Sequence, residues 1–211
     1  MGPMRGIKVF APLVFVLLLA GCTALKVVTH KVSDNPVDAP AGTYRIDPHH
    51  TSVHFNVDHL GFSRFVARFN HIEGTLDAVP SAPEKSSLSV TIDAASIDTN
   101  VGELDEMLKG ADMFDAANHP DIRFVSTGLK RTGQATGEMT GDLTIRNRTN
   151  PVTLYVSFNG AAPDPLTGKD TLGFSATGSF DRADWGLSAW WPAVGNEVHI
   201  RIEAEFVKPK S

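Results

Sequence analysis

Four histidines lie within the eleven residues from 49 to 59, which read HHTSVHFNVDH. Histidine is a frequent metal ligand, but the same stretch alternates apolar and polar residues, which predicts a β-strand. His50 and His54 then share its polar face ~13 Å apart, whereas two nitrogens that bind one zinc ion lie only ~4 Å apart. We therefore expect hydrogen-bonded strand histidines, with no metal and no cofactor. A site completed by a distant histidine is left open: His71, His119 or His199.

Two further motifs resemble catalytic arrangements but lack residues that those arrangements require. The stretch GLSAW around Ser188 begins like a nucleophile elbow, but Trp190 stands where the tight turn needs a second glycine. The stretch TGKDT at 167–171 resembles part of a phosphate loop, but Pro163 replaces the earlier glycine and Asp170 replaces serine or threonine. We therefore expect that the protein is not an enzyme.

The composition is typical of one globular domain with a sizeable core. The chain has 211 residues, of which 42% are hydrophobic and 20% charged. Its formal net charge is −5, and it has no stripe of basic and aromatic residues that would neutralise phosphates. Nucleic acid is therefore not an expected partner.

The N-terminal residues are typical of an export signal. Arg5 and Lys8 precede an apolar run from Val9 to Ala20, which is too short to span a bilayer because a spanning helix needs ~20 apolar residues. Cys22, the only cysteine in the sequence, directly follows LLLAG, which resembles the lipobox of bacterial lipoproteins. We expect a signal peptide over residues 1–21 and lipidation of Cys22. A buried cysteine behind an ordinary signal peptide is the alternative.

Residues 22–42 are expected to form a flexible tether, because they show no sustained period and end in proline and glycine. The residue after the cysteine is Thr23 and not aspartate, which by resemblance to lipoprotein sorting rules favours the outer membrane. The expected location is the bacterial cell envelope, with the N-terminal lipid anchor in the outer membrane and the domain facing the periplasm.

Short segments with a period of two predict an all-β domain over residues 43–209. The segment VHIRIEAEF sets Val198, Ile200 and Ile202 on one side and charged residues on the other, as in a half-buried strand. About eight such segments, joined by turn residues, predict an eight-stranded antiparallel barrel, because closure removes the exposed edges of a sheet. A sandwich of two open sheets is the alternative.

Apolar side chains on these strands and in one connection predict the lining of the barrel. An eight-stranded barrel is just wide enough to be filled by its own side chains or to hold one small ligand. One or two short helices are expected in the connection GELDEMLKGADMF, because its apolar residues share a helical stripe. Paired tryptophans in a loop are unfavourable to expose unless they cover a barrel mouth or contact lipid. The predicted lining residues are Val53, Phe55, Val57, Phe65, Phe69, Val90, Ile92, Leu104, Met107, Leu108, Met113, Phe114, Phe124, Leu143, Leu154, Val156, Phe158, Phe174, Trp185, Trp190 and Trp191.

Between residues 43 and 207 the chain contains, in this order, YRIDPHHTSVHFNVDHLGFSRFVARF, SIDTN, ADMFDAANHPDIRF, GDLTIRNRT, FDRADWGL and VGNEVHI. Their order and spacing resemble the YceI-like family along nearly all of this region. The resemblance implies a lipocalin-like barrel, export to the periplasm, no catalytic residues, and an apolar interior that binds a long-chain amphiphile such as a polyisoprenoid. The chain departs from the family at 104–108, where LDEML lacks the usual arginine and histidine, and at Ala67, which replaces a glycine.

The expected function is non-catalytic binding, sequestration or transport of a hydrophobic long-chain amphiphile in the barrel interior. A polyisoprenoid, a quinone or a fatty amide would supply the long chain. The alternative is a packed barrel without a cavity ligand, acting as an envelope-stress or interaction lipoprotein through its tryptophan loop. Pairing with a second copy to form a homodimer is left open.

Overall fold

Alternating apolar and polar residues form eleven β-strand segments in the computed structural model, which describes residues 26–209. The segments are β1 (Gly42–Ile46), β2 (Ser52–His59), β3 (Ser63–Phe69), β4 (Ile72–Ala78), β5 (Ser87–Asp93), β6 (Ile97–Asp98), β7 (Asp121–Arg131), β8 (Thr136–Ile145), β9 (Arg148–Pro163), β10 (Asp170–Asp181) and β11 (Val194–Val207). The predicted signal peptide and the predicted lipidation of Cys22 lie outside the described residues and stay predictions.

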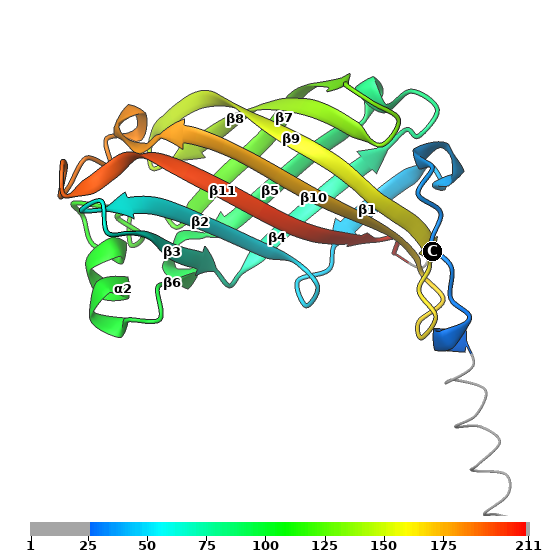
Figure 1. Cartoon of the computed structure of the whole chain (residues 1–211), viewed down its shortest axis with the longest axis horizontal. Coiled ribbons are helices and arrows are strands. Elements are labelled where there is room, and N and C mark those ends of the chain that lie inside the picture. Colours follow the sequence, from blue (N-terminus) through cyan, green and yellow to red (C-terminus); the bar gives the residue numbers. More distant parts are fainter. Residues whose placement is uncertain (1–25, 210–211) are drawn as a thin grey trace, which may run out of the picture.

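The segments make eight antiparallel strands that close into a barrel (Figure 1). β1 and β2 follow one another along β11, β4 and β3 pair with them on the other side, and β5 and β6 form the next strand. The ring continues through β7, β8, β9 and β10 to β11, where Arg45 of β1 lies opposite Val207. The predicted eight-stranded antiparallel barrel is therefore confirmed.

Three of the eight strands are interrupted, and one of these breaks separates β3 from β4. At this break the backbone N–H groups of Asn70 and His71 donate to the hydroxyl oxygen of Ser96, at 3.2 and 3.0 Å. The backbone carbonyl of Ser96 also accepts from the N–H of Asn70, at 3.0 Å, so the chain bends here without leaving these two donors unpaired.

The connection between β6 and β7 contains the helix α2 (Gly102–Lys109), in the stretch where the sequence predicts one. Asp105 fixes its first turn, because its Oδ1 accepts hydrogen bonds from the backbone N–H and the hydroxyl of Thr99, at 2.7 and 2.6 Å. Four short 3-10 helices are η1 (Pro36–Asp38), η2 (Pro83–Lys85), η3 (Ala94–Ser96) and η4 (Arg182–Trp185). Within residues 26–209, none of the helices has the length and apolar character needed to cross a membrane.

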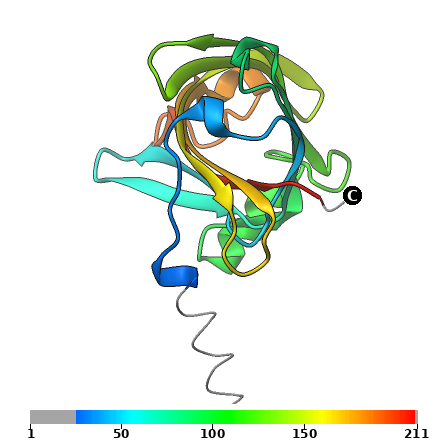
Figure 2. The same ribbon diagram turned by 90° about the vertical axis from the view of Figure 1, so that its right-hand side faces the viewer.

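Residues 33–41, here named the strap, lie against the end of the barrel that Figure 2 shows face-on. Ser33 exchanges two backbone hydrogen bonds with Ala161 of β9, at 3.0 and 2.9 Å, and Ala39 is buried. The hydroxyl of Tyr44 donates to the carbonyl of Pro40 at 2.7 Å. The sequence predicts a flexible tether up to residue 42, whereas in the structure its second half is bound to the barrel, because these backbone groups find partners there.

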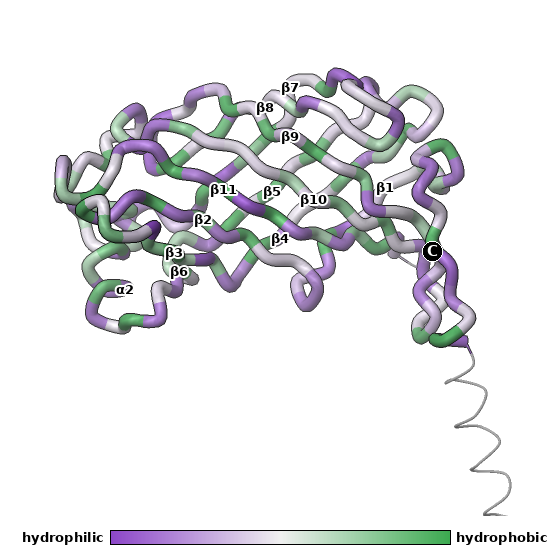
Figure 3. The backbone as a smooth tube through the Cα atoms, in the orientation of Figure 1, coloured by the Kyte–Doolittle hydropathy of each residue, from purple (hydrophilic) through white to green (hydrophobic). Residues whose placement is uncertain are grey.

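Apolar and polar residues alternate along the strands, as the changing colours in Figure 3 show. On β11, Val198, Ala204 and Phe206 are buried, while the side chains of Arg201 and Glu203 are exposed and pair at 3.1 Å. We name the two ends of the barrel after what lies there. The strap end carries the strap, and the rim end carries α2 and the loop 186–193 between η4 and β11.

Candidate ligand cavity

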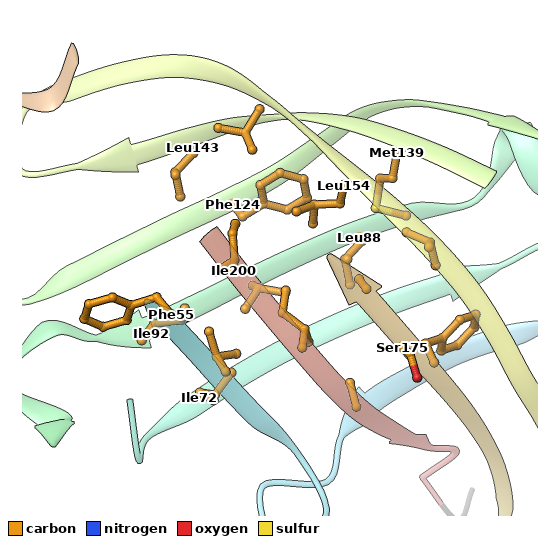
Figure 4. Close-up of a pocket in the computed structure, with 18 of the residues that line it drawn as sticks. Phe55, Ile72, Leu88, Ile92, Phe124, Met139, Leu143, Leu154, Ser175 and Ile200 are labelled. Carbon is orange, nitrogen blue, oxygen red and sulfur yellow. The ribbon is translucent and has the colours of Figure 1, made fainter. Parts of the chain in front are cut away.

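The inner faces of the strands enclose an elongated cavity of about 730 Å³. Its lining extends from Pro36 and Ala39 at the strap end to Leu187 and Trp190 at the rim end. The side chains drawn in Figure 4 project into this space from strands on all sides, and nearly all of their atoms are carbon. The cavity lies within the size range of sites that hold small organic molecules, which is about 300–1,000 Å³.

The barrel is hollow because inward-facing side chains line the space without filling it. Leu88, Val90 and Ile200 point inward, yet each is only partly buried. A side chain at the centre of a filled core would be almost completely covered by its neighbours. The accessible surface that remains on these residues therefore faces the cavity.

All of the predicted lining residues except Trp185 and Trp191 border the cavity. From β2 and β3 these are Val53, Phe55, Val57, Phe65 and Phe69; from β5, Val90 and Ile92; from α2 and the loop after it, Leu104, Met107, Leu108, Met113 and Phe114; from β7 and β8, Phe124 and Leu143; from β9 and β10, Leu154, Val156, Phe158 and Phe174; and from the rim loop, Trp190. Whether these residues bind a ligand stays a prediction, but the structure does bring them to one cavity.

Trp185 and Trp191 are corrections to the predicted lining. Trp185 is only 2% exposed, but its ring packs edge-on against Phe180 at 4.8 Å and its indole N–H donates to the carbonyl of Leu143 at 3.0 Å. A buried indole N–H needs an acceptor, and this bond holds the ring in the wall and not in the hollow. Trp191 is 61% exposed and points away from the cavity into solvent.

Two glycines in the inner wall lie where a larger residue would collide with neighbouring atoms. A Cβ at Gly141 would lie 2.3 Å from the ring of Phe124, and a Cβ at Gly178 would lie 2.8 Å from the backbone oxygen of Thr153. Gly141 faces inward between Met139 and Leu143 on β8, so its missing side chain leaves the room that the Phe124 ring occupies. The cavity outline therefore depends on the glycine as well as on the apolar residues.

Arg182 is the buried charged residue of the cavity lining and holds the rim loop in place. It is 4% exposed, and burial lowers the pKa of its guanidinium. Its Nε and one terminal nitrogen donate to the carbonyls of Gly195 and Val194 at 2.8 and 2.9 Å, and the other terminal nitrogen donates to Leu187. Three carbonyls thus share one charge, and the loop between them is tied to the barrel wall.

Tyr44 lies in a packed cluster at the strap end, beside the cavity. Its side chain is fully buried beside Leu172 and Phe206, and burial raises the pKa of its hydroxyl to about 12. In the same cluster, the ring of Phe174 packs edge-on against the rings of Phe158 and Phe206, with centroid distances of 5.4 and 5.8 Å. The strap end therefore contains a packed aromatic cluster, and the cavity runs beside it.

The geometry agrees with a comparison of the sequence with known families, in which the model of the YceI-like domain matches residues 44–206. The chain belongs to the YceI-like family. Relatives of this YceI-like chain include a UPF0312 protein of Pseudomonas putida, 36% identical over 82% of this chain and 90% of the relative. Another is a UPF0312 protein of Pseudomonas fluorescens, 35% identical over 81% of this chain and 88% of the relative.

Solved structures share the barrel of this YceI-like chain. The YCEI protein of Campylobacter jejuni is 28% identical, with a TM-score of 0.66 over 72% of this chain and 90% of that one. BcnA of Burkholderia cenocepacia is 22% identical, with a TM-score of 0.69 over 76% and 98%. A polyisoprenoid binding domain from Saccharophagus degradans is 11% identical, with a TM-score of 0.63 over 81% and 100%. The last two likenesses support the fold alone.

The histidine-rich stretch of this YceI-like chain lies on the outside of the barrel and away from the cavity, apart from His59. His50 lies 3.0 Å from Asp47 and 3.8 Å from Glu205, and the hydrogen bond to Asp47 raises its pKa. Among residues 26–209 this is the one group of three side chains close enough together to hold a metal ion, and it includes a single histidine. His50 lies in the turn before β2, so the prediction that it shares a strand face with His54 is wrong. His54 is not part of this group.

Sequence reasoning missed lining residues of two kinds. Leu88 has the same parity as Val90 and Ile92, which were predicted, and Ile200 and Ile202 lie on the apolar side of their strand, so the alternation contained their signal. Pro36 and Ala39 of the strap had no such signal, because nothing in their local sequence shows that the strap folds back onto the barrel end.

Proposed function

We propose that the protein binds the long apolar chain of an amphiphile inside its barrel, and so sequesters or carries it without catalysing a reaction. The observation behind this proposal is the cavity of about 730 Å³ with its hydrocarbon lining. A polyisoprenoid, a quinone or a fatty amide has a chain of this kind. The Saccharophagus degradans structure with the same fold is a polyisoprenoid binding domain, which agrees with this ligand class.

Burial of the chain would supply most of the affinity. At about 0.8 kcal/mol per CH₂, ten buried methylenes contribute roughly 8 kcal/mol before the entropy of association is subtracted. The cavity walls are already exposed to the hollow, so the ligand would bury apolar protein surface as well as its own. Few polar groups of the lining could contribute to binding beside the burial of apolar surface. One of them is the hydroxyl of Thr51, whose Oγ1 is buried without a hydrogen-bond partner among the described residues.

The alternative function, an interaction protein with a solidly packed barrel, does not agree with the hollow interior. A packed barrel of eight strands would have inward side chains in mutual contact across the axis. Here Leu88, Val90 and Ile202 keep accessible surface on their inner side.

Native mass spectrometry of protein purified from its own cells tests the proposal directly. We expect an added mass that organic extraction releases and identifies as a long-chain lipid, and the emptied protein should take up a fluorescent prenyl probe. A protein with neither added mass nor probe uptake would contradict the proposed function.

A pair of neighbouring substitutions on β10 gives a matched control. Ala176 faces the cavity and Thr177 faces outward. Ala176→Phe places a ring in the hollow and should reduce probe uptake at least tenfold, because the ring displaces several methylenes of the ligand. Thr177→Phe adds the same ring to the outer surface and should leave uptake unchanged. Equal uptake by both variants would place the ligand outside the barrel.

The proposal includes an N-terminal lipid anchor on Cys22 and a location in the bacterial cell envelope. The expected site is the outer membrane, with the domain facing the periplasm. It is supported by the position of Cys22 directly after LLLAG. Cys22→Ser should move the protein from the membrane fraction to the soluble periplasmic fraction. Unchanged fractionation of Cys22→Ser would contradict the anchor and leave the cavity proposal standing.

A further inference from the structure

Four large apolar side chains are exposed on two adjacent loops at the rim end, and we name them the rim patch: Leu60, Phe62, Trp190 and Trp191. Phe62 is 87% exposed and Trp191 61%, which are high values for aromatic residues. The two loops are joined, because the backbone N–H of Leu60 donates to the carbonyl of Ala193 at 2.8 Å. Apolar side chains that gather in this way usually mark a binding surface.

The two loops contain no charged residue. The turn at 60–63 reads LGFS, and the loop at 186–194 reads GLSAWWPAV. A protein interface normally surrounds its apolar centre with a polar rim, whereas a segment that enters a membrane interface avoids charge and favours tryptophan. The composition of the rim patch therefore fits a lipid surface.

The rim patch is continuous with the cavity. Trp190 is 43% exposed to solvent and also lines the cavity, together with Leu187, Ala193 and Val194 of the same loop. Across the mouth, Met107 of α2 likewise lines the cavity and is 54% exposed. An apolar chain that leaves the cavity at this end emerges between side chains that are themselves apolar on their outer side.

The area of the rim patch is too small for a stable dimer. Given that a large aromatic side chain buries about 150–250 Å², the exposed parts of the four side chains amount to roughly 500 Å². A specific protein interface buries about 800 Å² on each partner. Insertion into a bilayer has no such minimum, because its strength grows with whatever apolar area is buried.

We propose that the rim patch docks on the surface of a lipid bilayer and places the cavity mouth against it. The passage of a ligand chain between bilayer and cavity rests on the proposed function, whereas docking itself does not. The strap, which connects to the N-terminus, lies at the opposite end of the barrel (Figure 1). An anchor at Cys22 therefore does not bring the rim patch to a membrane by itself, and docking adds a second contact.

Quenching of tryptophan fluorescence by brominated phosphatidylcholine tests the docking in the full chain. Trp190 and Trp191 belong to the rim patch, and the third tryptophan, Trp185, is 2% exposed and serves as an internal baseline. Two arrangements are compared. The brominated lipid is placed either in the vesicles that already carry the protein or in a second population of vesicles added later. We expect strong quenching in at least one arrangement, and its loss in the double variant Trp190→Phe/Trp191→Phe.

Phe62→Ser and Leu166→Ser form a matched pair at the two ends of the barrel. Phe62 and Leu166 are 87% and 69% exposed, and Leu166 lies in the hairpin between β9 and β10 at the strap end. Phe62→Ser should weaken binding to the second vesicle population roughly tenfold, the factor expected when one phenylalanine no longer leaves water. Leu166→Ser should leave binding unchanged.

Quenching of the native chain that equals that of the double variant in both arrangements would overturn the docking proposal. Equal loss in Phe62→Ser and Leu166→Ser would also overturn it, because contact would not be specific to the rim. Gel filtration that shows a dimer lost on Phe62→Ser would assign the patch to a second copy instead. Prenyl probe uptake in solution is measured in parallel, so a failure of the cavity proposal is seen separately from a failure of docking.

Discussion

The two ends of the barrel are built on opposite plans. At the strap end a cluster of large side chains is buried, with Tyr44 fully buried and Leu172 only 2% exposed. At the rim end Phe62 and Trp191 are exposed, and the loop that carries Trp191 is held by the buried Arg182. The strap end is stabilised by packing, whereas polar bonds to backbone carbonyls hold the rim loop.

This difference shows how one barrel can be both stable and open. Packing of aromatic rings supplies stability at the strap end. Bonds from Arg182 and from the indole of Trp185 fix the base of the rim loop, so the side chains at its tip are not needed for folding. Substitutions at the two ends should therefore have very different effects on stability.

Tyr44→Ala should produce the largest effect. Loss of a fully buried aromatic side chain typically lowers the free energy of unfolding by about 3–5 kcal/mol, and here the hydrogen bond to Pro40 is lost as well. Tyr155 is 61% exposed on the outer face of β9, so Tyr155→Ala is the matched control and should change stability by less than about 1 kcal/mol. Urea denaturation measures both, and similar losses would mean that the buried cluster around Tyr44 does not stabilise the strap end.

Alkaline pH should weaken the strap end through the same tyrosine. The pKa of Tyr44 is raised to about 12 in the folded protein, against an ordinary value near 10, so the fold favours the protonated hydroxyl. Its contribution is complete below pH 10 and is lost as the pH rises from 10 through 12, by roughly 2–3 kcal/mol in total at about 1.4 kcal/mol per unit.

Urea denaturation of the native chain and of Tyr44→Phe at pH 8, 10 and 11.5 checks this direction. Tyr44→Phe should be less stable by about 1 kcal/mol at pH 8, because it lacks the hydrogen bond to Pro40. The difference should shrink or reverse at pH 11.5. Parallel pH profiles would show that the hydroxyl titrates normally in the folded state.

The sequence predicted the barrel and most of its inner wall because both follow from a period of two. Once β2 and β11 are recognised as strands, parity alone places Val57 and Ile200 on the apolar side. It did not place Trp185, whose side chain is fixed by a hydrogen bond to Leu143, a residue 42 positions earlier in the chain. Contacts between distant residues leave no local pattern, and the strap was missed for the same reason.

Gly160→Ala should release the strap and have an intermediate effect. Gly160 has a φ of +152°, and a Cβ there would lie 2.1 Å from a methyl carbon of Val32, so the segment leading into the strap must move. We expect a loss of about 2 kcal/mol and faster hydrogen exchange at the amide of Ser33, which bonds to Ala161.

Gly168→Ala is the control for the backbone strain in Gly160→Ala. Gly168 has a φ of +68°, but a Cβ there would meet nothing within 4 Å, so its replacement adds strain without a collision. It should cost about 1 kcal/mol and leave the exchange of Ser33 unchanged. If both variants speed that exchange equally, the strap does not depend on the contact with Gly160.

Phe62→Ser and Trp191→Ser should have the smallest effect on stability of all. Both side chains are more than half exposed, so their removal creates no cavity in the core. The free energy of unfolding should therefore change by less than about 0.5 kcal/mol. Urea denaturation of the two variants beside Tyr44→Ala makes the comparison. A loss of several kcal/mol would mean that the rim side chains are structural, and their exposure would then need another explanation than contact with a lipid surface.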